Sequence, residues 1–106
     1  MSNNKNLEPF NKKGERHGYW EIYRYNGTMR YKGNYVNSQL HGYFEDYYSN
    51  GQLANKGNFV NSEYHGLWEF YLYDGLLDDK CHYDNGKRVD YEVLIESVTS
   101  EMFPIY

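Results

Sequence analysis

The stretch HGYFEDYYSNG (residues 41–51) nearly recurs at two other places in the chain. Upstream it reads HGYWEIYRYNG (residues 17–27), and downstream it reads HGLWEFYLYDG (residues 65–75). The starts of successive copies are 24 residues apart in both cases. Self-similarity at a fixed period is the signature of a repeat architecture, in which each unit packs mainly against its neighbours.

Each 24-residue unit contains two predicted strands separated by turn signals. The first run, residues 19–25 in unit one, is rich in aromatic residues and ends at Asn-Gly or Asp-Gly. These pairs favour tight hairpin turns because both residues tolerate positive φ. The second run, residues 29–36, ends at Asn37-Ser38, and its counterparts end at Asn61-Ser62 and Asn85-Gly86. Gly recurs about every eight residues, which disfavours a helix. The sequence predicts a mostly β fold, a single-layer antiparallel β-meander of stacked hairpins.

Side chains alternate across a strand, so each first run has two faces. One face is predicted to pack, and it carries Trp20 and Ile22, Phe44 and Tyr48, and Trp68, Phe70 and Leu72. The other face is predicted to be wetter, and it carries Tyr19, Glu21, Tyr23 and Tyr25, then Tyr43, Glu45 and Tyr47, then Glu69, Tyr71 and Tyr73. The pattern does not assign the faces of the second runs.

Gly33 and Gly57 lie at matching places inside the second runs. A Gly inside a strand marks a bulge or a close approach of another group, so we expect a large ring from the neighbouring strand over each of them. Unit three has Cys81 at this place. The position therefore requires a small side chain rather than positive φ.

These units resemble the short variant of the MORN repeat, of the form hG-x-W-x-x-Y-x-x-n-G followed by x-G-x-Y. The second half of the pattern reads KGNY, KGNF and KCHY here, and the resemblance covers residues 14–90. It departs at Cys81 and at Val89-Asp90, where a fourth His-Gly would fall. The resemblance implies a single-layer sheet of stacked hairpins and little about activity. Bacterial proteins with this variant include ones named as antitoxins, and other members act in scaffolding or membrane association.

The two ends of the chain depart from the period. Residues 1–13 are predicted to form an arm, with Phe10 on an incomplete strand that caps the repeat sheet of residues 14–90. In the C-terminal segment, residues 91–106, a helical apolar stripe is formed by Tyr91, Leu94, Ile95, Val98 and Met102. We expect residues 90–101 to form a helix that caps the Trp face or the last strand. Alternatively, the apolar tail of residues 102–106 engages a partner or a second copy.

Composition limits the class of protein. The 106 residues suffice for one small domain, and 20% of them are aromatic, including 14 Tyr. The net charge of −4 disfavours binding to nucleic acid or to anionic membranes. The single Cys excludes an internal disulfide and fits a reducing compartment.

The N-terminus lacks the apolar run of a signal peptide, and no segment approaches the length of a membrane span. We therefore expect a cytoplasmic protein of a bacterial cell or an infected host cell. Usage rich in Asn, Lys and Tyr hints at an AT-rich genome, such as that of a phage, a low-GC bacterium or a large DNA virus.

Few residues of the sequence are candidates for catalysis or metal binding. His17, His41 and His65 recur one hairpin apart, roughly 10 Å, which is too far to share one zinc ion. The Glu row has the same spacing, which is marginal for a pair of catalytic carboxylates. Cys81 and His82 are adjacent on a strand and point to opposite faces, so they form no dyad. We expect no catalytic residue, no metal site, no cofactor and no enzymatic activity.

The repetition favours a binding surface, because Tyr offers large contact area with few rotors to freeze. Our candidate partner-binding residues are Tyr19, Glu21, Tyr23, Tyr43, Glu45, Tyr47, Glu69, Tyr71 and Tyr73. Acidic groups among these Tyr favour a protein partner with a basic surface, such as a nucleic-acid enzyme or a defence protein. The antitoxin resemblance agrees, so we expect a non-catalytic inhibitor, antitoxin or immunity-like protein.

Two alternatives remain open. The first is a self-assembling structural protein, including a homodimer, that uses its edge strands or C-terminal tail. The second is a binder of nucleotides or single-stranded nucleic acid that uses the Tyr side chains together with Lys32, Lys56 and Lys80.

Overall fold

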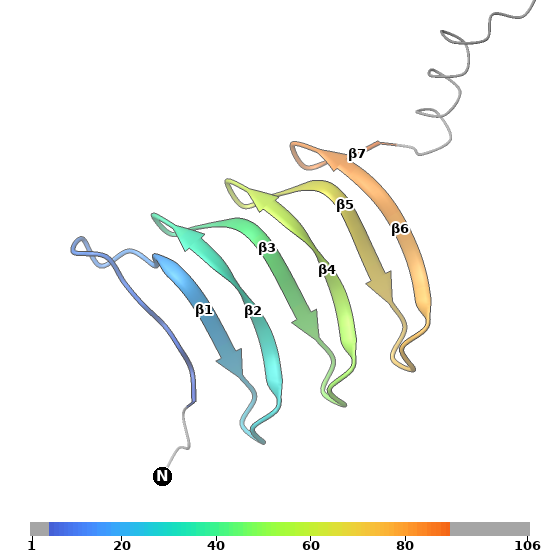
Figure 1. Cartoon of the computed structure of the whole chain (residues 1–106), viewed down its shortest axis with the longest axis horizontal. Helices are drawn as coiled ribbons and strands as arrows, with labels where there is room; N and C mark the ends of the chain where they lie inside the picture. Colours follow the sequence, from blue (N-terminus) through green and yellow to red (C-terminus); the bar gives the residue numbers. More distant parts are fainter. Residues whose placement is uncertain (1–4, 90–106) are drawn as a thin grey trace, which may run out of the picture.

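The computed structural model describes residues 5–89 and shows a single antiparallel sheet, in which the strands lie in sequence order (Figure 1). The seven strands are β1 (Gly18–Tyr23), β2 (Met29–Val36), β3 (Gln39–Tyr47), β4 (Leu53–Val60), β5 (Glu63–Tyr71), β6 (Leu77–Asp84) and β7 (Lys87–Val89). This confirms the mostly β meander of stacked hairpins. The helix expected at residues 90–101, and the segment 91–106 to which it was assigned, lie outside the described residues.

The two ends of the hairpins use different turns. Both residues have positive φ at Asn37-Ser38, Asn61-Ser62 and Asn85-Gly86, as a two-residue hairpin turn requires. The same turn was expected at Asn26-Gly27, and that expectation was wrong, because there only the Gly has positive φ. In that loop the Asn26 side chain accepts the backbone N–H of Thr28 at 3.1 Å. Asn50 and Asp74 do the same in the later units, so the Asn or Asp acts as a side-chain acceptor.

Ser38 has φ of 71°, a conformation that strains any residue carrying a Cβ. We expect Ser38→Gly to raise the free energy of unfolding by about 1 kcal/mol, because Gly adopts this conformation without strain. Urea denaturation measures the change. Ser49→Gly is the control, because Ser49 lies in a turn without positive φ and should show no gain. An equal gain at both positions would show that relief of backbone strain is not the cause.

The packed face is a layer of rings that lie over small residues. The ring of Phe44 lies over Gly33, where a Cβ would be 2.8 Å from Phe44 Cδ2, and the indole of Trp68 lies over Gly57. Neither Gly has positive φ. The expectation of a close ring approach is confirmed, and the absence of a side chain is the reason for Gly at both places. Cys81, opposite Trp68, is also buried.

The rings bury one another without help from a second layer among residues 5–89. Trp68 is 0% exposed. Tyr64 stacks on it with ring centroids 4.0 Å apart, and Phe59 meets it edge-on at 5.1 Å. The Trp68 indole N–H donates to the backbone oxygen of Asn58 at 2.8 Å, so burial leaves this polar group satisfied.

The N-terminal segment covers the outer edge of β1. Leu7 pairs with Glu21, and Phe10 pairs with Arg16. The Phe10 ring lies 5.4 Å from the Trp20 ring, whose indole N–H donates to the backbone oxygen of Pro9. Phe10 therefore lies on a short extended segment at the start of the stack, where the sequence placed an incomplete strand.

Leu72 and Tyr48 do not belong to the packed face, which corrects the sequence-based assignment. β3 ends at Tyr47 and β5 ends at Tyr71, so both residues lie in loops where strand alternation no longer applies. Leu72 is 43% exposed. The Tyr48 hydroxyl donates to the backbone oxygen of Tyr71 at 2.6 Å, which links one unit to the next.

Candidate binding face

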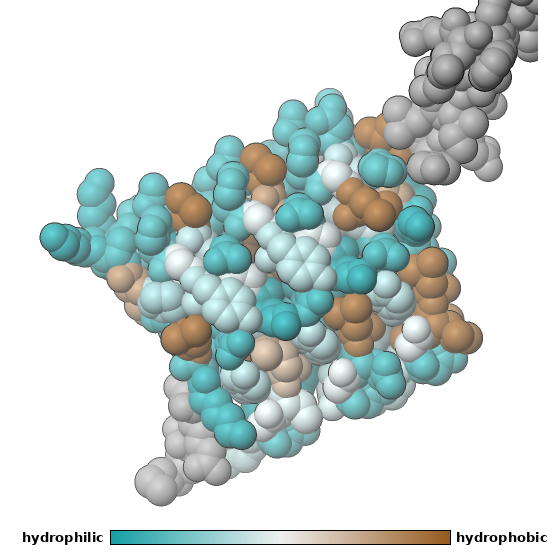
Figure 2. Space-filling model, in the orientation of Figure 1, coloured by the Kyte–Doolittle hydropathy of each residue, from teal (hydrophilic) through white to brown (hydrophobic). Residues whose placement is uncertain are grey.

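The face opposite the rings carries three rows of side chains that run across the strands. We call it the open face. Its rows are Tyr19, Tyr43 and Leu67; then Glu21, Lys32, Glu45, Lys56, Glu69 and Lys80; then Tyr23, Tyr47 and Tyr71. Figure 2 shows that the rings in the middle of the visible face lie flat against the sheet, among hydrophilic groups.

The middle row alternates in charge from strand to strand. Glu21 lies opposite Lys32, which lies opposite Glu45, and the same pairing continues to Lys80. Lys32 Nζ is 3.2 Å from Glu45 Oε1, and Lys56 Nζ is 3.6 Å from Glu69 Oε1. Such partly exposed pairs stabilise by about 0.2–1 kcal/mol each. The row holds as many Lys as Glu and therefore has no net charge.

Each of the first two Glu side chains is held by two Tyr hydroxyls on its own strand. The Tyr19 hydroxyl donates to Glu21 Oε2 at 2.8 Å, and the Tyr23 hydroxyl donates to Glu21 Oε1 at 2.9 Å. In unit two, Tyr43 and Tyr47 hold Glu45 in the same way. These bonds orient the rings before any partner arrives.

The hydrogen bonds and partial burial shift the ionisation of this face. Burial, with the hydrogen bond to Glu21, raises the pKa of Tyr19 to about 12. Burial and the bond to Glu45 likewise raise the pKa of Tyr43 and of Tyr47. Burial alone would raise the pKa of Glu45, but hydrogen bonds from Tyr43, Tyr47 and Lys32 outweigh it, and the pKa lies below its usual value. At neutral pH the phenols are donors and the Glu45 carboxylate is their acceptor.

Most of the predicted site residues come together on the open face. The residues that do so are Tyr19, Glu21, Tyr23, Tyr43, Glu45, Tyr47, Glu69 and Tyr71. Tyr73 does not, because it follows the end of β5 and its ring packs 5.3 Å from that of Tyr48 in the neighbouring loop. Leu67 was missed, although it occupies the place of Tyr19 and Tyr43 in the 24-residue alignment.

The acidic balance of the chain lies only partly on the sheet, because residues 18–89 carry −2, which the +2 of residues 1–17 offsets. Residues 1–89 hold all 11 Lys and Arg and 11 of the 15 Asp and Glu, so they carry no net charge. The remaining four acidic residues lie in residues 90–106. The middle row of the open face has no net charge, and this removes the charge argument for a basic partner on that face. It equally leaves Lys32 and Lys56 engaged with Glu rather than free for phosphates.

One of the recurring His residues has a local structural role. His17 Nδ1 accepts the backbone N–H of Asn37 at 3.3 Å, so this His supports a turn. Within residues 5–89, no cluster of three or more His, Cys, Asp or Glu side chains has the arrangement of a metal site. In the same part of the chain, no helix has the length and apolar character needed to cross a membrane.

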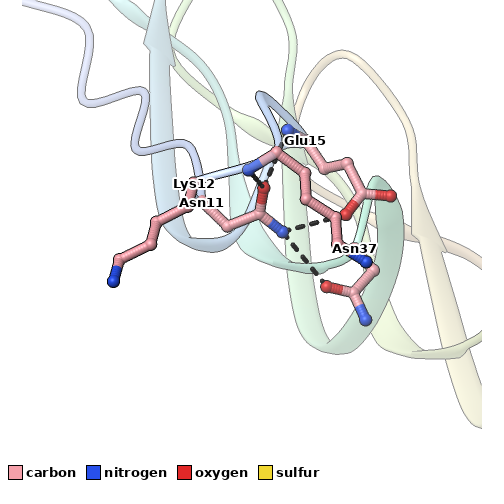
Figure 3. Close-up of a pocket in the computed structure, with 5 residues that line it drawn as sticks. Asn11, Lys12, Glu15 and Asn37 are labelled. Atoms are coloured by element: carbon pink, nitrogen blue, oxygen red, sulfur yellow. Dashed lines mark hydrogen bonds between the residues drawn. The ribbon is translucent and has the colours of Figure 1, made fainter.

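A hollow of about 360 Å³ lies at the N-terminal turn, lined by Asn11, Lys12, Lys13, Glu15 and Asn37 (Figure 3). The Asn11 amide donates to Glu15 at 3.0 Å and to Asn37 at 3.2 Å, and its oxygen accepts the backbone N–H of Lys13. The polar groups of Asn11 are thus used to hold the turn itself. The hollow is part of that turn and does not form a convergent ligand site.

Comparison with known proteins agrees with the geometry. No curated protein matches the chain. Residues 16–37 and residues 40–61 each match the family model of the MORN repeat variant. The matched segments correspond to β1–β2 and β3–β4, and β5–β6 repeats their strand pairing. These two segments are therefore MORN repeats of the variant form.

Proposed function

We propose that this protein is a non-catalytic binding module that contacts a protein partner through the open face. The row of Tyr19, Tyr43 and Leu67 supports this, because these side chains are 39%, 46% and 38% exposed. They lie on β1, β3 and β5, two strand spacings apart, so the row spans roughly 20 Å. Aromatic residues of this kind are enriched at protein interfaces.

The observation that carries the proposal is the fixed orientation of the rings. Tyr19 and Tyr43 are each tied to a Glu on their own strand before binding. Ordering side chains on binding costs about 0.5–1.5 kcal/mol each, and here much of that ordering is already present. A partner with an apolar centre and mixed charges around it would complement the rings and the alternating row.

A protein partner is favoured over nucleic acid by the charges. Affinity for nucleic acid depends on cations that are free to meet phosphates. Lys32 and Lys56 are instead paired with Glu across the strands, and residues 1–89 carry no net charge. The Tyr rings alone do not compensate for this lack of available positive charge.

The finer proposal is that binding inhibits the partner, as the resemblance to antitoxin-named repeat proteins implies. A flat face can cover a partner's functional surface without contributing any chemistry. Interfaces of standard size take about 800 Å² from each partner, and a row of roughly 20 Å across a sheet is compatible with that size.

The test uses the double variant Tyr19→Ala/Tyr43→Ala. A partner is captured from a lysate of the source cell with tagged protein, and its affinity is then measured by calorimetry. We expect the double variant to bind at least roughly 25-fold more weakly, because each central Tyr contributes more than about 1 kcal/mol. Tyr19→Phe/Tyr43→Phe keeps the rings but removes the hydroxyl bonds that orient them, so it should bind more weakly than the parent protein and more tightly than the alanine variant.

The matched control is Tyr25→Ala, because Tyr25 is fully exposed in a loop outside the open face. It should bind as the parent protein does, and thermal melting shows whether each variant is folded. Unchanged affinity in the folded double variant would refute the face assignment. If the partner binds but keeps its full activity at saturation, the inhibitory role is excluded and the binding role remains.

A further inference from the structure

The two outer edges of the sheet differ. Residues 7–10 cover β1, whereas β7 pairs only with His82, Tyr83 and Asp84 of β6. Among residues 5–89, no strand pairs with the rest of the outer edge of β6, from Leu77 to Cys81. Unpaired edges are the places where another strand adds to a sheet.

The alternating charged row stops at this edge. Lys32 and Lys56 each reach a Glu on the following strand. Lys80 is the next cation of the row, and it is exposed and has no ion pair within residues 5–89. The chain does not repeat the pattern beyond it, because Val93 stands 24 residues after Glu69. Within the described residues, the last Lys of the row therefore lacks the acidic neighbour that the other two have on the following strand.

An exposed apolar cluster lies beside the same edge. We call it the apolar corner, and it consists of Leu72, Leu76 and Leu77, which are 43%, 64% and 50% exposed. Figure 2 shows hydrophobic surface gathered at this end of the sheet. The counterparts of Leu72 in the first two units are Arg24 and Tyr48, which donate to backbone oxygens of the next unit. The corner is apolar where the earlier units are polar and engaged.

We propose that the edge of β6 binds a second copy of this chain, with the two β6 strands antiparallel about a two-fold axis at Asp79. This register places Asp78 opposite Lys80 of the second copy, and Lys80 opposite its Asp78. Registers centred on Asp78 or on Lys80 would set two like charges without an ion pair against each other at the axis, which is destabilising. The Asp79 carboxylates at the chosen axis are each paired with Arg88, and of these three registers only this one sets Asp78 against Lys80.

One hydrogen bond must be exchanged for this pairing, because the backbone N–H of Lys80 donates to Asp79 Oδ1 of its own chain at 2.8 Å. The two Asp79 side chains would meet at the axis, and each is already paired with Arg88 of its own chain, at 3.0 Å. In this register Leu76 lines up with His82 of the second copy. The outer side of that His82 is already paired with Val89, so Leu76 meets the Val89 end of β7 in the second copy. The dimer would continue the charged row and bury part of the apolar corner. It does not depend on the proposed function of the open face.

The test is charge reversal at the edge in the full chain, with mass measured by light scattering over a concentration series. The parent protein, with chains of 12.8 kDa, should show a dimer that dissociates on dilution. Lys80→Asp and Asp78→Lys should each raise the dimer Kd roughly 10-fold or more, because two ion pairs become two repulsive contacts. An equal mixture of the two variants should form a heterodimer, because unlike charges face each other again.

The control is Lys13→Asp, which reverses a charge at the N-terminal turn, away from the edge, and should leave the dimer Kd unchanged. Thermal melting confirms that the variants are folded. A parent protein that stays monomeric at every concentration would overturn the proposal. So would a dimer that neither reversal weakens, or a mixture of the two variants that shows no preference for the heterodimer.

Discussion

Gly57→Ala is expected to lower the free energy of unfolding by about 3 kcal/mol, at the upper end of the range for overpacked cores. A Cβ at this position would overlap the indole ring of Trp68. The ring has no free space on its other side, because Tyr64 stacks on it at 4.0 Å and Trp68 is 0% exposed. The strand or the ring must therefore shift. Urea denaturation followed by circular dichroism measures the loss.

A double-mutant cycle isolates the cause. In a Trp68→Ala background, Gly57→Ala should change stability by less than about 0.5 kcal/mol, because the overlapping ring is gone. Gly33→Ala is the matched comparison, with an expected loss of about 1–2 kcal/mol, because its Cβ would meet the edge of the Phe44 ring at 2.8 Å. A loss at Gly57 that is equal in both backgrounds would show that the ring contact is not responsible.

Trp68→Ala is expected to lower the free energy of unfolding by about 4 kcal/mol. The change removes the most buried side chain of the ring layer and leaves a cavity beside Phe59 and Tyr64. It also leaves the backbone oxygen of Asn58 without the indole N–H. Single domains are stable by only about 5–15 kcal/mol, so the variant should unfold at a much lower urea concentration.

Two further variants separate packing from general effects. Trp68→Phe keeps a ring over Gly57 and should lose less than half as much stability as Trp68→Ala. Leu72→Ala removes an apolar side chain that is 43% exposed, so its effect should stay below about 0.5 kcal/mol. If Trp68→Ala is no more destabilising than Leu72→Ala, the ring layer is not the core of the sheet.

The strands could be predicted because their signals are local. The run at residues 29–36 matches β2, since both its boundaries are turn residues. The small residue required at Gly33 and Gly57 was also predictable, because a Gly inside a strand marks a bulge or the close approach of another group. By contrast, Leu72 was misassigned because β5 ends at Tyr71, and alternation gives no warning of where a strand ends.

Only part of the candidate site could be predicted from the sequence. Alternation within one strand places Tyr19, Glu21 and Tyr23 on one face without knowledge of any other strand. It does not show which side chains of the neighbouring strand lie beside them on that face. That depends on the turns and bulges between strands, and a shift of one residue exchanges the two faces. The loop at Asn26-Gly27, whose turn was predicted wrongly, lies between β1 and β2 and so helps to set Lys32 opposite Glu21.

The amino-acid sequence is sufficient to predict the repeat, its hairpins, and the placement of the Trp and Phe rings on the opposite face from the Tyr and Glu side chains. These properties follow from the 24-residue period and from contacts within a unit. The tertiary structure alone decided that Lys and Glu alternate in one neutral row, and that within residues 5–89 the row ends at a Lys80 without an ion pair. It also decided that an apolar corner is exposed beside that Lys. The physical reason is that these properties belong to pairs of strands, whose register is set only when the whole sheet is assembled.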